Sequence, residues 1–331
     1  MPARVAIVIP NWNQAAMLAA TLASLGRQSY PIDRVIIVDN GSTDDSAAIA
    51  ARAGAEVISL GKNLGFAAAV NRGIQAAPGA DYVGILNNDV TLAADWLARL
   101  MAALESGEAW FATGKLLDAQ DHQRMDGSFD AVCRGACAWK CGHGRTDSAQ
   151  WNQPRTIDLA PFTAVVFRAA AFERVGLLDE SFESYLEDVD WGLRSAGAGL
   201  NGRYIPQAVA YHRGSATLGQ WHPDTVRRIA RNQLLLVAKH YPANWVLRYG
   251  WSVFIAQTLW GLVALRHGAL LSYLAGKVEG MRQFHQTRVH QTRKNPCARI
   301  PAILERSEKE IYDIQKSTGF DLYWRLYFAL T

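Results

Sequence analysis

Val-Asp-Asn-Gly-Ser-Thr-Asp-Asp-Ser, residues 38–46, continues the apolar run Val-Ile-Ile-Val of residues 35–38. A short apolar run predicts a buried strand, and the polar cluster lies where that strand ends. In α/β folds the carboxyl ends of parallel strands form the edge at which ligands bind. The stretch therefore predicts a nucleotide-binding edge to which Asp39 contributes its carboxylate. The alternative is that Asp39 caps the helix that follows.

Residues 3–90 alternate apolar strands with helical segments. Four strands are expected, over residues 5–9, 35–39, 57–60 and 82–86. Strands that alternate with helices imply a parallel sheet with right-handed crossovers. The sequence therefore predicts an α/β fold, with a mostly parallel nucleotide-binding sheet flanked by helices.

The segments that follow are less regular. An amphipathic helix is expected over residues 92–104, whereas residues 118–155 are polar, Gly-rich and aperiodic. A segment of that kind predicts a loop, which we expect to be mobile and to lie near the acceptor. The sheet is expected to resume over residues 163–167, and a helix is expected over residues 169–175.

Composition places the chain among enzymes of ordinary polarity. Of its 331 residues 50% are hydrophobic and 19% are charged, and the net charge of +4 is too small to indicate a nucleic-acid partner. The apolar run near the N-terminus is short and ends at Pro10, which is unlike a signal peptide. Four cysteines do not form the framework of a secreted protein. We therefore expect a cytoplasmic protein with reduced thiols.

Further polar motifs accompany the opening stretch. They are Ile-Val-Ile-Pro-Asn-Trp-Asn at 7–13, Asn-Leu-Gly-Phe at 63–66, Asn-Arg-Gly at 71–73, Ile-Leu-Asn-Asn-Asp at 85–89, Tyr-Leu-Glu-Asp-Val-Asp-Trp at 185–191 and Tyr-His at 211–212. In this order and at these separations the set resembles the family 2 glycosyltransferases, which are inverting enzymes of the GT-A fold. The rhamnosyltransferase-like branch is the most similar, and the resemblance covers residues 4–240.

The resemblance implies a nucleotide site made by the first two strand ends and their neighbours. Backbone groups and the Asp39 carboxylate would contact the base, and three asparagines would contact the base or ribose. These residues are Pro10, Asn11, Trp12, Asn13, Asp39, Asn71 and Asn88.

The same resemblance implies a divalent metal site. Asn87-Asn88-Asp89 occupies the position of the family's Asp-x-Asp element but has one carboxylate in place of two. Asp89 and His212 would hold Mg²⁺ or Mn²⁺, an ion that often uses one or two carboxylates and completes its shell with water and phosphate. Arg213 and Ser215 would contact the diphosphate. The alternatives are that Asp89 caps a helix and that residues 213–217 form a polar turn.

Three carboxylates within four residues mark the expected catalytic position. Glu187, Asp188 and Asp190 begin a helix, where the helix dipole stabilises negative charge, so the alternative is that they form only an acidic first turn. By resemblance Asp188 is the general base of a single inverting displacement, and Glu187 supports it. Asp190 and Trp191 would contact the acceptor or the diphosphate.

The chain changes character near residue 240. We expect a catalytic domain over residues 1–240 and a helical, basic extension over residues 241–331. Residues 249–265 are uncharged and largely apolar, yet too short to span a bilayer, and basic residues follow them. The combination favours docking on the anionic cytoplasmic face of the plasma membrane. The alternative is that these helices pack on the catalytic domain.

Together these features predict an inverting, metal-assisted glycosyltransferase. The first expected donor is dTDP-L-rhamnose and the second is a UDP-hexose, with a lipid-linked or cell-surface glycan as acceptor. A sugar nucleotidyltransferase would need a Gly-rich phosphate loop after the first strand, where Pro10-Asn11-Trp12-Asn13 stands instead. A catalytically inactive, membrane-associated scaffold with the same fold is the other alternative. The missing carboxylate at Asn87 favours it, and the intact Glu187-Asp188 pair opposes it.

Overall fold

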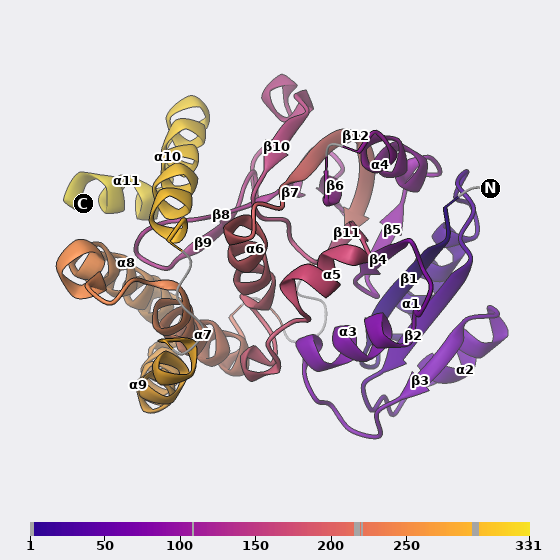
Figure 1. Ribbon diagram of the computed structural model, residues 1–331, viewed down its shortest axis with the longest axis horizontal. Helices are drawn as coiled ribbons and strands as arrows, with labels where there is room; N and C mark the ends of the chain where they lie inside the picture. The colour runs from indigo at the N-terminus through magenta and orange to yellow at the C-terminus, as the bar shows by residue number, and fades with distance from the viewer. Residues whose placement is uncertain (1–2, 108, 215–218, 220, 293–297) are drawn as a thin grey trace. The chain divides into compact units, whose positions relative to one another are not determined.

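The computed structural model describes residues 3–107, 109–214, 219, 221–292 and 298–331, which form two compact units (Figure 1). Unit 1 contains Met1–Phe129, Gly142–Ser195 and Gly199–Thr217, and unit 2 contains Asp130–Cys141, Ala196–Ala198 and Leu218–Thr331. The division expected after residue 240 therefore falls between two helices of unit 2.

Unit 1 is an alternating α/β structure. Its elements are β1 (Val5–Asn11), α1 (Ala15–Leu25), β2 (Arg34–Asp39), α2 (Ser46–Arg52), β3 (Glu56–Ser59), α3 (Phe66–Gln75), β4 (Tyr82–Leu86), β5 (Val90–Leu92), α4 (Trp96–Glu105), β6 (Phe111–Asp118), β7 (Met125–Gly127), η1 (Ala149–Asn152), β10 (Arg155–Ile157), β11 (Ala164–Arg168), α5 (Ala170–Val175), η2 (Glu180–Phe182), α6 (Glu187–Gly197) and β12 (Gly202–His212). Each of the four strands expected before residue 90 is present within two residues of its expected bounds.

One sheet organises this unit. Its strand order is β10-β12-β6-β11-β4-β1-β2-β3, and β5 and β7 pair with β12 and β6. The four strands from β4 to β3 are parallel, as are β6 and β12, whereas β11 runs antiparallel to both of its neighbours. The predicted α/β fold with a mostly parallel sheet is confirmed.

Helices cover both faces of the sheet because side chains alternate along each strand. Ile7 packs in one cluster with side chains of α1 and α4. The next residue, Val8, points the opposite way, and a Cβ on Gly73 of α3 would lie 2.1 Å from its side chain. Gly73 therefore allows α3 to approach the sheet closely. Because the helices cover the two faces of the sheet, loops form the edge at the carboxyl ends of β1, β2 and β4.

The expectation of a loop over residues 118–155 is wrong for much of that stretch. β7 pairs with β6, η1 and β10 follow, and Met125, Phe129 and Trp151 are buried. These strands have three residues each. A strand of that length is too short to show the period-2 pattern on which sequence-based assignment depends.

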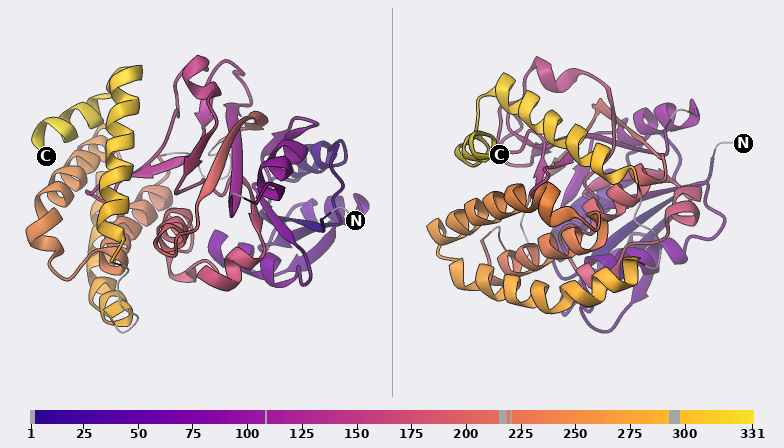
Figure 2. Two further views of the ribbon diagram at one scale, coloured as in Figure 1. Left: turned by 45° about the horizontal axis from the view of Figure 1, so that its top comes forward. Right: turned by 60° about the vertical axis from the view of Figure 1, so that its left-hand side comes forward.

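Unit 2 consists of a hairpin and five helices among its described residues. The hairpin is β8 (Asp130–Val132) and β9 (Ala138–Lys140), and the helices are α7 (Pro223–His240), α8 (Trp245–Arg266), α9 (Leu270–Thr292), α10 (Ile300–Thr318) and α11 (Leu322–Leu330). Helix α9 packs on both α7 and α8, α10 packs on β8, and α11 packs on α8 (Figure 2). The helical C-terminal region expected from the sequence is thus confirmed. Over the described ranges, no helix combines the length and the apolarity that crossing a bilayer requires.

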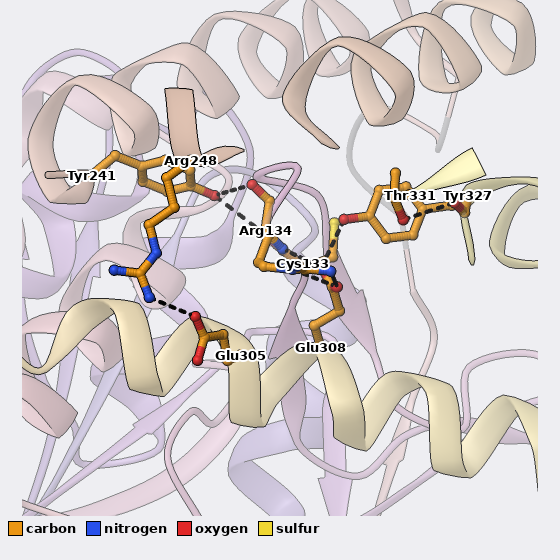
Figure 3. Close-up of polar contacts among 8 residues, drawn as sticks. All are labelled: Cys133, Arg134, Tyr241, Arg248, Glu305, Glu308, Tyr327 and Thr331. Carbon is orange, nitrogen blue, oxygen red and sulfur yellow. Dashed lines mark hydrogen bonds and ion pairs between the residues drawn. The ribbon is translucent and has the colours of Figure 1, made fainter. Parts of the chain in front are cut away.

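A partly buried ion pair joins the hairpin of unit 2 to α10 (Figure 3). The Arg134 backbone N–H donates to Glu308 Oε2 at 2.7 Å, and Arg134 Nε donates to Glu308 Oε1 at 2.7 Å. Tyr327 OH also donates to Glu308 Oε2, at 2.7 Å. Both carboxylate oxygens of Glu308 therefore have protein donors.

Candidate active site

The carboxyl edge of the parallel strands brings several predicted residues together. β1 lies between β2 and β4, so Asn11, Asp39 and the Asn87-Asn88-Asp89 segment follow neighbouring strands. Asn88 Nδ2 donates to Asn11 Oδ1 at 2.7 Å and lies 3.4 Å from the Asn13 carbonyl oxygen. These contacts lock the asparagines of two strand ends into one hydrogen-bonded cluster.

The loops after β1 and β2 are joined to each other. Ser42 Oγ accepts from the Asn13 backbone N–H at 2.8 Å and from Asn11 Nδ2 at 3.1 Å. Asn13 Oδ1 accepts from the Thr43 N–H at 2.9 Å. Pro10 and Trp12 belong to this joined segment, and their contact with a base stays a prediction.

Asp39 is buried at the centre of this edge. Its Oδ1 accepts from the Ser42 N–H at 3.3 Å, inside the turn, whereas the N-cap position of α2 is occupied by Asp45. The structure therefore does not support the alternative in which Asp39 caps the next helix. Its carboxylate remains a candidate for the base.

The Asn71 side chain makes its hydrogen bonds with Leu178 and Glu180 and not with the asparagines of the strand ends. Its Nδ2 donates to the Leu178 carbonyl and to Glu180 Oε1, both at 3.0 Å, and its Oδ1 accepts from the Leu178 N–H at 2.9 Å. Both N–H donors of the amide are thus used inside the protein. This placement does not support a nucleotide contact. Asn71 instead ties α3 to the segment that leads toward α6.

The two predicted metal ligands meet although 123 positions of sequence separate residues 89 and 212. β5 pairs with β12 so that Val90 lies opposite His212, and the Arg213 N–H donates to the Asp89 carbonyl at 3.2 Å. His212 Nε2 consequently lies 3.2 Å from Asp89 Oδ1, and both side chains are buried. Asp89 faces this imidazole and caps no helix.

Asp126 is a site residue that the sequence did not reveal. Its Oδ2 lies 2.8 Å from His212 Nδ1, the nitrogen that Asp89 does not contact. His143 Nδ1 lies 3.0 Å from the Asp126 carbonyl oxygen and 3.7 Å from its Oδ1. The pairing of β7 with β6 brings Asp126 to this position, and no spacing in the sequence indicates that pairing.

The two carboxylates change the proton affinity of the imidazole. Burial is the largest influence and lowers the pKa of His212, but hydrogen bonds to Asp126 and Asp89 raise it more, to about 9. His212 is thus protonated near neutral pH when nothing else binds Asp89. A cation bound between Asp89 and His212 would displace that proton.

The donor set fits a divalent ion that brings most of its own ligands. Within the described part of the chain, no three His, Cys, Asp or Glu side chains form a metal-binding group. Asp89 and His212 would supply one oxygen and one nitrogen, and water with diphosphate oxygens would fill the remaining positions, as Mg²⁺ often requires. The Asp126 contact to Nδ1 is the usual orienting partner of a metal-binding histidine. Arg213 is exposed beside this pair, and Ser215 lies outside the described residues.

Glu187, Asp188 and Asp190 occupy the first turn of α6, as predicted. Glu187 is buried, and its Oε2 has no hydrogen-bond partner. Burial raises the pKa of Glu187, and the nearby charges of Asp188 and Asp190 raise it further. Asp188 is half-buried, and its Oδ1 accepts from the Val189 N–H at 2.8 Å. The more buried of these two neighbouring carboxyls thus has the raised pKa.

Asp190 and Trp191 lie in the interior instead of at the site. Arg194 Nε donates to Asp190 Oδ2 at 3.0 Å, and Asp190 is fully buried. Trp191 is 1% exposed, packs against four phenylalanines and donates its Nε1 to the Gly176 carbonyl at 2.9 Å. This placement does not support the expected contacts of either residue with acceptor or diphosphate.

The segment before α6 has an unusual backbone. Glu183, Tyr185 and Leu186 have φ values of 58°, 72° and 67°, a region that costs energy for residues other than glycine. The N-terminus of α3 holds the segment, because the Ala67 N–H donates to the Glu183 carbonyl at 2.9 Å. A Cβ on Gly65 would lie 2.8 Å from that same oxygen. Glu187 and Asp188 are therefore presented by a fixed, strained turn.

Comparisons with known proteins agree with this architecture. The family model described as Glycosyl transferase family 2 matches residues 6–174. The N-acetylglucosaminyl-diphospho-decaprenol L-rhamnosyltransferase of Mycobacterium tuberculosis is 26% identical over an alignment of 283 residues, which covers 78% of this chain and 90% of that enzyme. A PGL/p-HBAD biosynthesis glycosyltransferase of Mycobacterium bovis is 32% identical over 133 residues, 38% of this chain and 51% of that protein.

Solved structures share the fold at low sequence identity. GalNAc-T7 with UDP, GalNAc and Mn²⁺ superposes with a TM-score of 0.64 at 13% identity, covering 96% of this chain and 58% of that one. The mannosyltransferase PcManGT of Pyrobaculum calidifontis, with GDP-Man and Mn²⁺, has a TM-score of 0.54 at 15% identity and covers 99% and 87%. At these identities the likeness shows the GT-A fold.

Proposed function

Because the chain belongs to glycosyl transferase family 2 and is a glycosyltransferase, we propose that it transfers L-rhamnose from dTDP-L-rhamnose to a hydroxyl of a lipid-linked glycan. The donor and acceptor are suggested by the mycobacterial rhamnosyltransferase, which aligns with 78% of this chain. The observation that carries the proposal is the Asp89 and His212 pair, 3.2 Å apart, beside a hydrogen-bonded strand edge of the kind that binds nucleotides.

Asp188 acts as the general base in the proposed reaction. Its carboxylate accepts the proton of the acceptor hydroxyl while the oxygen forms a bond to the anomeric carbon. The bond from that carbon to the diphosphate breaks, and its electron pair leaves with the nucleoside diphosphate. A single displacement of this kind inverts the anomeric configuration. When bound between Asp89 and His212, Mg²⁺ or Mn²⁺ supplies positive charge for the leaving diphosphate.

Glu187 supports Asp188 and, in its neutral form, adds no negative charge beside it. Burial and the neighbouring acids raise the pKa of Glu187, which favours its neutral form and so reduces the negative charge beside Asp188. Opposite protonation states in two neighbouring carboxyls are a common sign of divided roles in an active site.

Ligand-dependent thermal shifts test the donor site. A ligand that binds the folded state raises its stability according to its affinity, so dTDP and UDP are compared with and without Mn²⁺. We expect Mn²⁺-dependent stabilisation that is lost in Asp89→Ala and His212→Ala and kept in Asp121→Ala, an exposed aspartate outside the cluster. Equal stabilisation of all four proteins would remove Asp89 and His212 from the donor site.

A transfer assay separates the possible donors. We expect purified protein to transfer rhamnose from dTDP-L-rhamnose to a lipid diphosphate that carries N-acetylglucosamine. Transfer from a UDP-hexose alone would replace the donor. Neither transfer nor donor hydrolysis with any nucleotide sugar that stabilises the protein would favour the inactive scaffold. We also propose that the enzyme works at the cytoplasmic face of the plasma membrane, where a lipid-linked acceptor would be within reach.

A further inference from the structure

Helix α8 is apolar on all sides, although one of its sides is open to solvent. Tyr249, Val253 and Ala256 are buried within unit 2. A second row of large apolar residues, spaced three, four or eight positions apart, is more than half exposed, with Leu247 at 91%; the row is Leu247, Trp251, Phe254, Leu262 and Leu265. A helix that is apolar all round normally lies in a protein core or against lipid.

Helix α9 repeats the arrangement. It packs closely on α7, since a Cβ on Gly276 would lie 2.1 Å from the Arg227 carbonyl oxygen. Exposed apolar residues three or four positions apart form another row, Leu271, Leu274, Val278 and Met281. We call the exposed rows of α8 and α9 the apolar rows. Scattered apolar residues are normal on a protein surface, but rows on adjacent helices mark an interaction site.

The charges of these helices indicate what covers the rows. Together α8 and α9 contain five basic residues and one acidic residue, Glu279. Two of the five are engaged within unit 2, since Lys277 Nζ donates to the Ala230 carbonyl at 2.9 Å and Arg248 pairs with Glu305 at 2.7 Å. Arg227 and Arg231 of α7 already bind Glu279, at 2.6 Å and 3.0 Å. Arg266 and Arg282 are exposed. A second copy of this surface would bring like charges together, whereas anionic lipid headgroups would complement them.

We propose that the apolar rows insert into the headgroup layer of an anionic membrane, with α8 and α9 lying in the plane of the surface. The proposal deepens the proposed function, because it states how an enzyme for a lipid-linked acceptor reaches that acceptor. Exposed Trp251 is the kind of side chain that prefers the membrane interface. Lipid contact through one face also agrees with the absence of a spanning helix from the described ranges.

Vesicle flotation tests the rows directly. The full chain is mixed with vesicles of phosphatidylcholine alone or with phosphatidylglycerol added, at low and high salt. We expect flotation that requires the anionic lipid and weakens with salt. The triple variant Leu247→Ser, Phe254→Ser, Leu262→Ser should lose at least about tenfold in vesicle affinity, since less apolar surface would be buried in the interface.

A matched control uses exposed leucines of the same unit. Leu322→Ser, Leu326→Ser, Leu330→Ser changes three exposed leucines of α11 and should float like the wild type. Equal losses in both triple variants, or no loss in the first, would overturn the assignment to α8 and α9. So would a concentration-dependent dimer that the first variant abolishes, because a second copy would then cover the rows.

Transfer to a water-soluble acceptor distinguishes this inference from the proposed function. The rows lie in unit 2, so the first variant should keep the transfer rate of the wild type with that acceptor. Protein that floats but never transfers sugar would defeat the proposed reaction and leave the membrane surface standing. Protein that transfers sugar but never floats would defeat the membrane surface and leave the proposed reaction standing.

Discussion

Glu187 of unit 1 and Glu308 of unit 2 are both 5% exposed, yet the protein treats them in opposite ways. Glu308 accepts hydrogen bonds from Arg134 and Tyr327 at 2.7 Å on both of its oxygens (Figure 3). Glu187 has a buried oxygen without a partner, and its neighbours Asp188 and Asp190 are acids.

Burial therefore does not distinguish a structural carboxylate from a functional one, but its partners do. A buried carboxylate with a full set of donors holds two segments of the chain together, as Glu308 does for the hairpin and α10. A buried carboxyl group among other acids has a raised pKa, and groups with a shifted pKa cluster at active sites. The first turn of α6 therefore has the kind of surroundings that the proposed catalytic role requires.

The contrast is sharpest in the acid pair itself. Asp188→Asn should lower the transfer rate by about 10²–10⁴-fold, because the amide keeps the shape but accepts no proton. Glu187→Gln should lower it far less, because a neutral amide resembles the neutral carboxyl. Transfer rates at saturating donor measure both effects. Comparable losses of transfer rate in the two variants would contradict the different roles proposed for Asp188 and Glu187.

Removing a carboxylate from unit 2 should affect folding instead. Glu308→Gln leaves the Arg134 guanidinium without its charged partner, and loss of one member of a buried pair costs about 3–5 kcal/mol. We expect the lower end, since the Arg134 side chain is 32% exposed. Glu305→Gln on the same helix breaks an exposed pair with Arg248 and should cost about 0–1 kcal/mol. Denaturant unfolding compares the two, and equal costs would contradict the comparison.

His212 should make the metal-free protein less stable at high pH. Its folded-state pKa of about 9 lies above the unfolded value of 6.5, so its contribution is full below about pH 6.5 and is lost as the pH rises through 9. The difference amounts to at most about 3.4 kcal/mol. Thermal unfolding in chelator across this range measures it. His212→Gln should remove this part of the pH dependence, and an unchanged slope would assign it to other groups.

Asp126 should influence the donor site through its contact with His212. Partners that orient a metal-binding histidine typically change metal affinity by about 10–100-fold, so Asp126→Ala should weaken Mn²⁺ binding by that factor. Asp126→Asn keeps an oxygen acceptor for His212 Nδ1 and should recover part of it. Calorimetry with Mn²⁺ and nucleoside diphosphate measures both variants. Wild-type affinity in Asp126→Ala would leave the residue a purely structural role.

The sequence predicted those parts of unit 1 whose strands and helices have a clear local pattern of apolar residues. The apolar runs of β1, β2 and β4 required a buried sheet, and their polar ends had to share one edge. Asp126 was missed because its position depends on β7, a strand of three residues that is too short to show a periodic pattern. The long apolar stretch of α8 was evident, but composition does not tell which of its sides a neighbour covers.

Asn71 and Trp191 show the limit of transferring roles from motifs. Both belong to segments that resemble a known family, and both have polar neighbours in the sequence. In the structure the amide of one and the indole of the other are already bonded to backbone carbonyls. Which way a side chain points depends on the packing of elements far away in sequence, and a motif does not contain that information.

The pairing of β5 with β12 has a consequence for how the molecule is made. Asp89 is available early in synthesis, but His212 belongs to the last strand of the sheet, so their approach is a contact of very high sequence separation. Such contacts form late because the intervening chain must first lose its freedom. The strands that present Asn11 and Asp39 can associate long before that moment. The 3.2 Å approach of Asp89 to His212 is therefore a marker of completed assembly, which a nascent chain ending before β12 has no means to form.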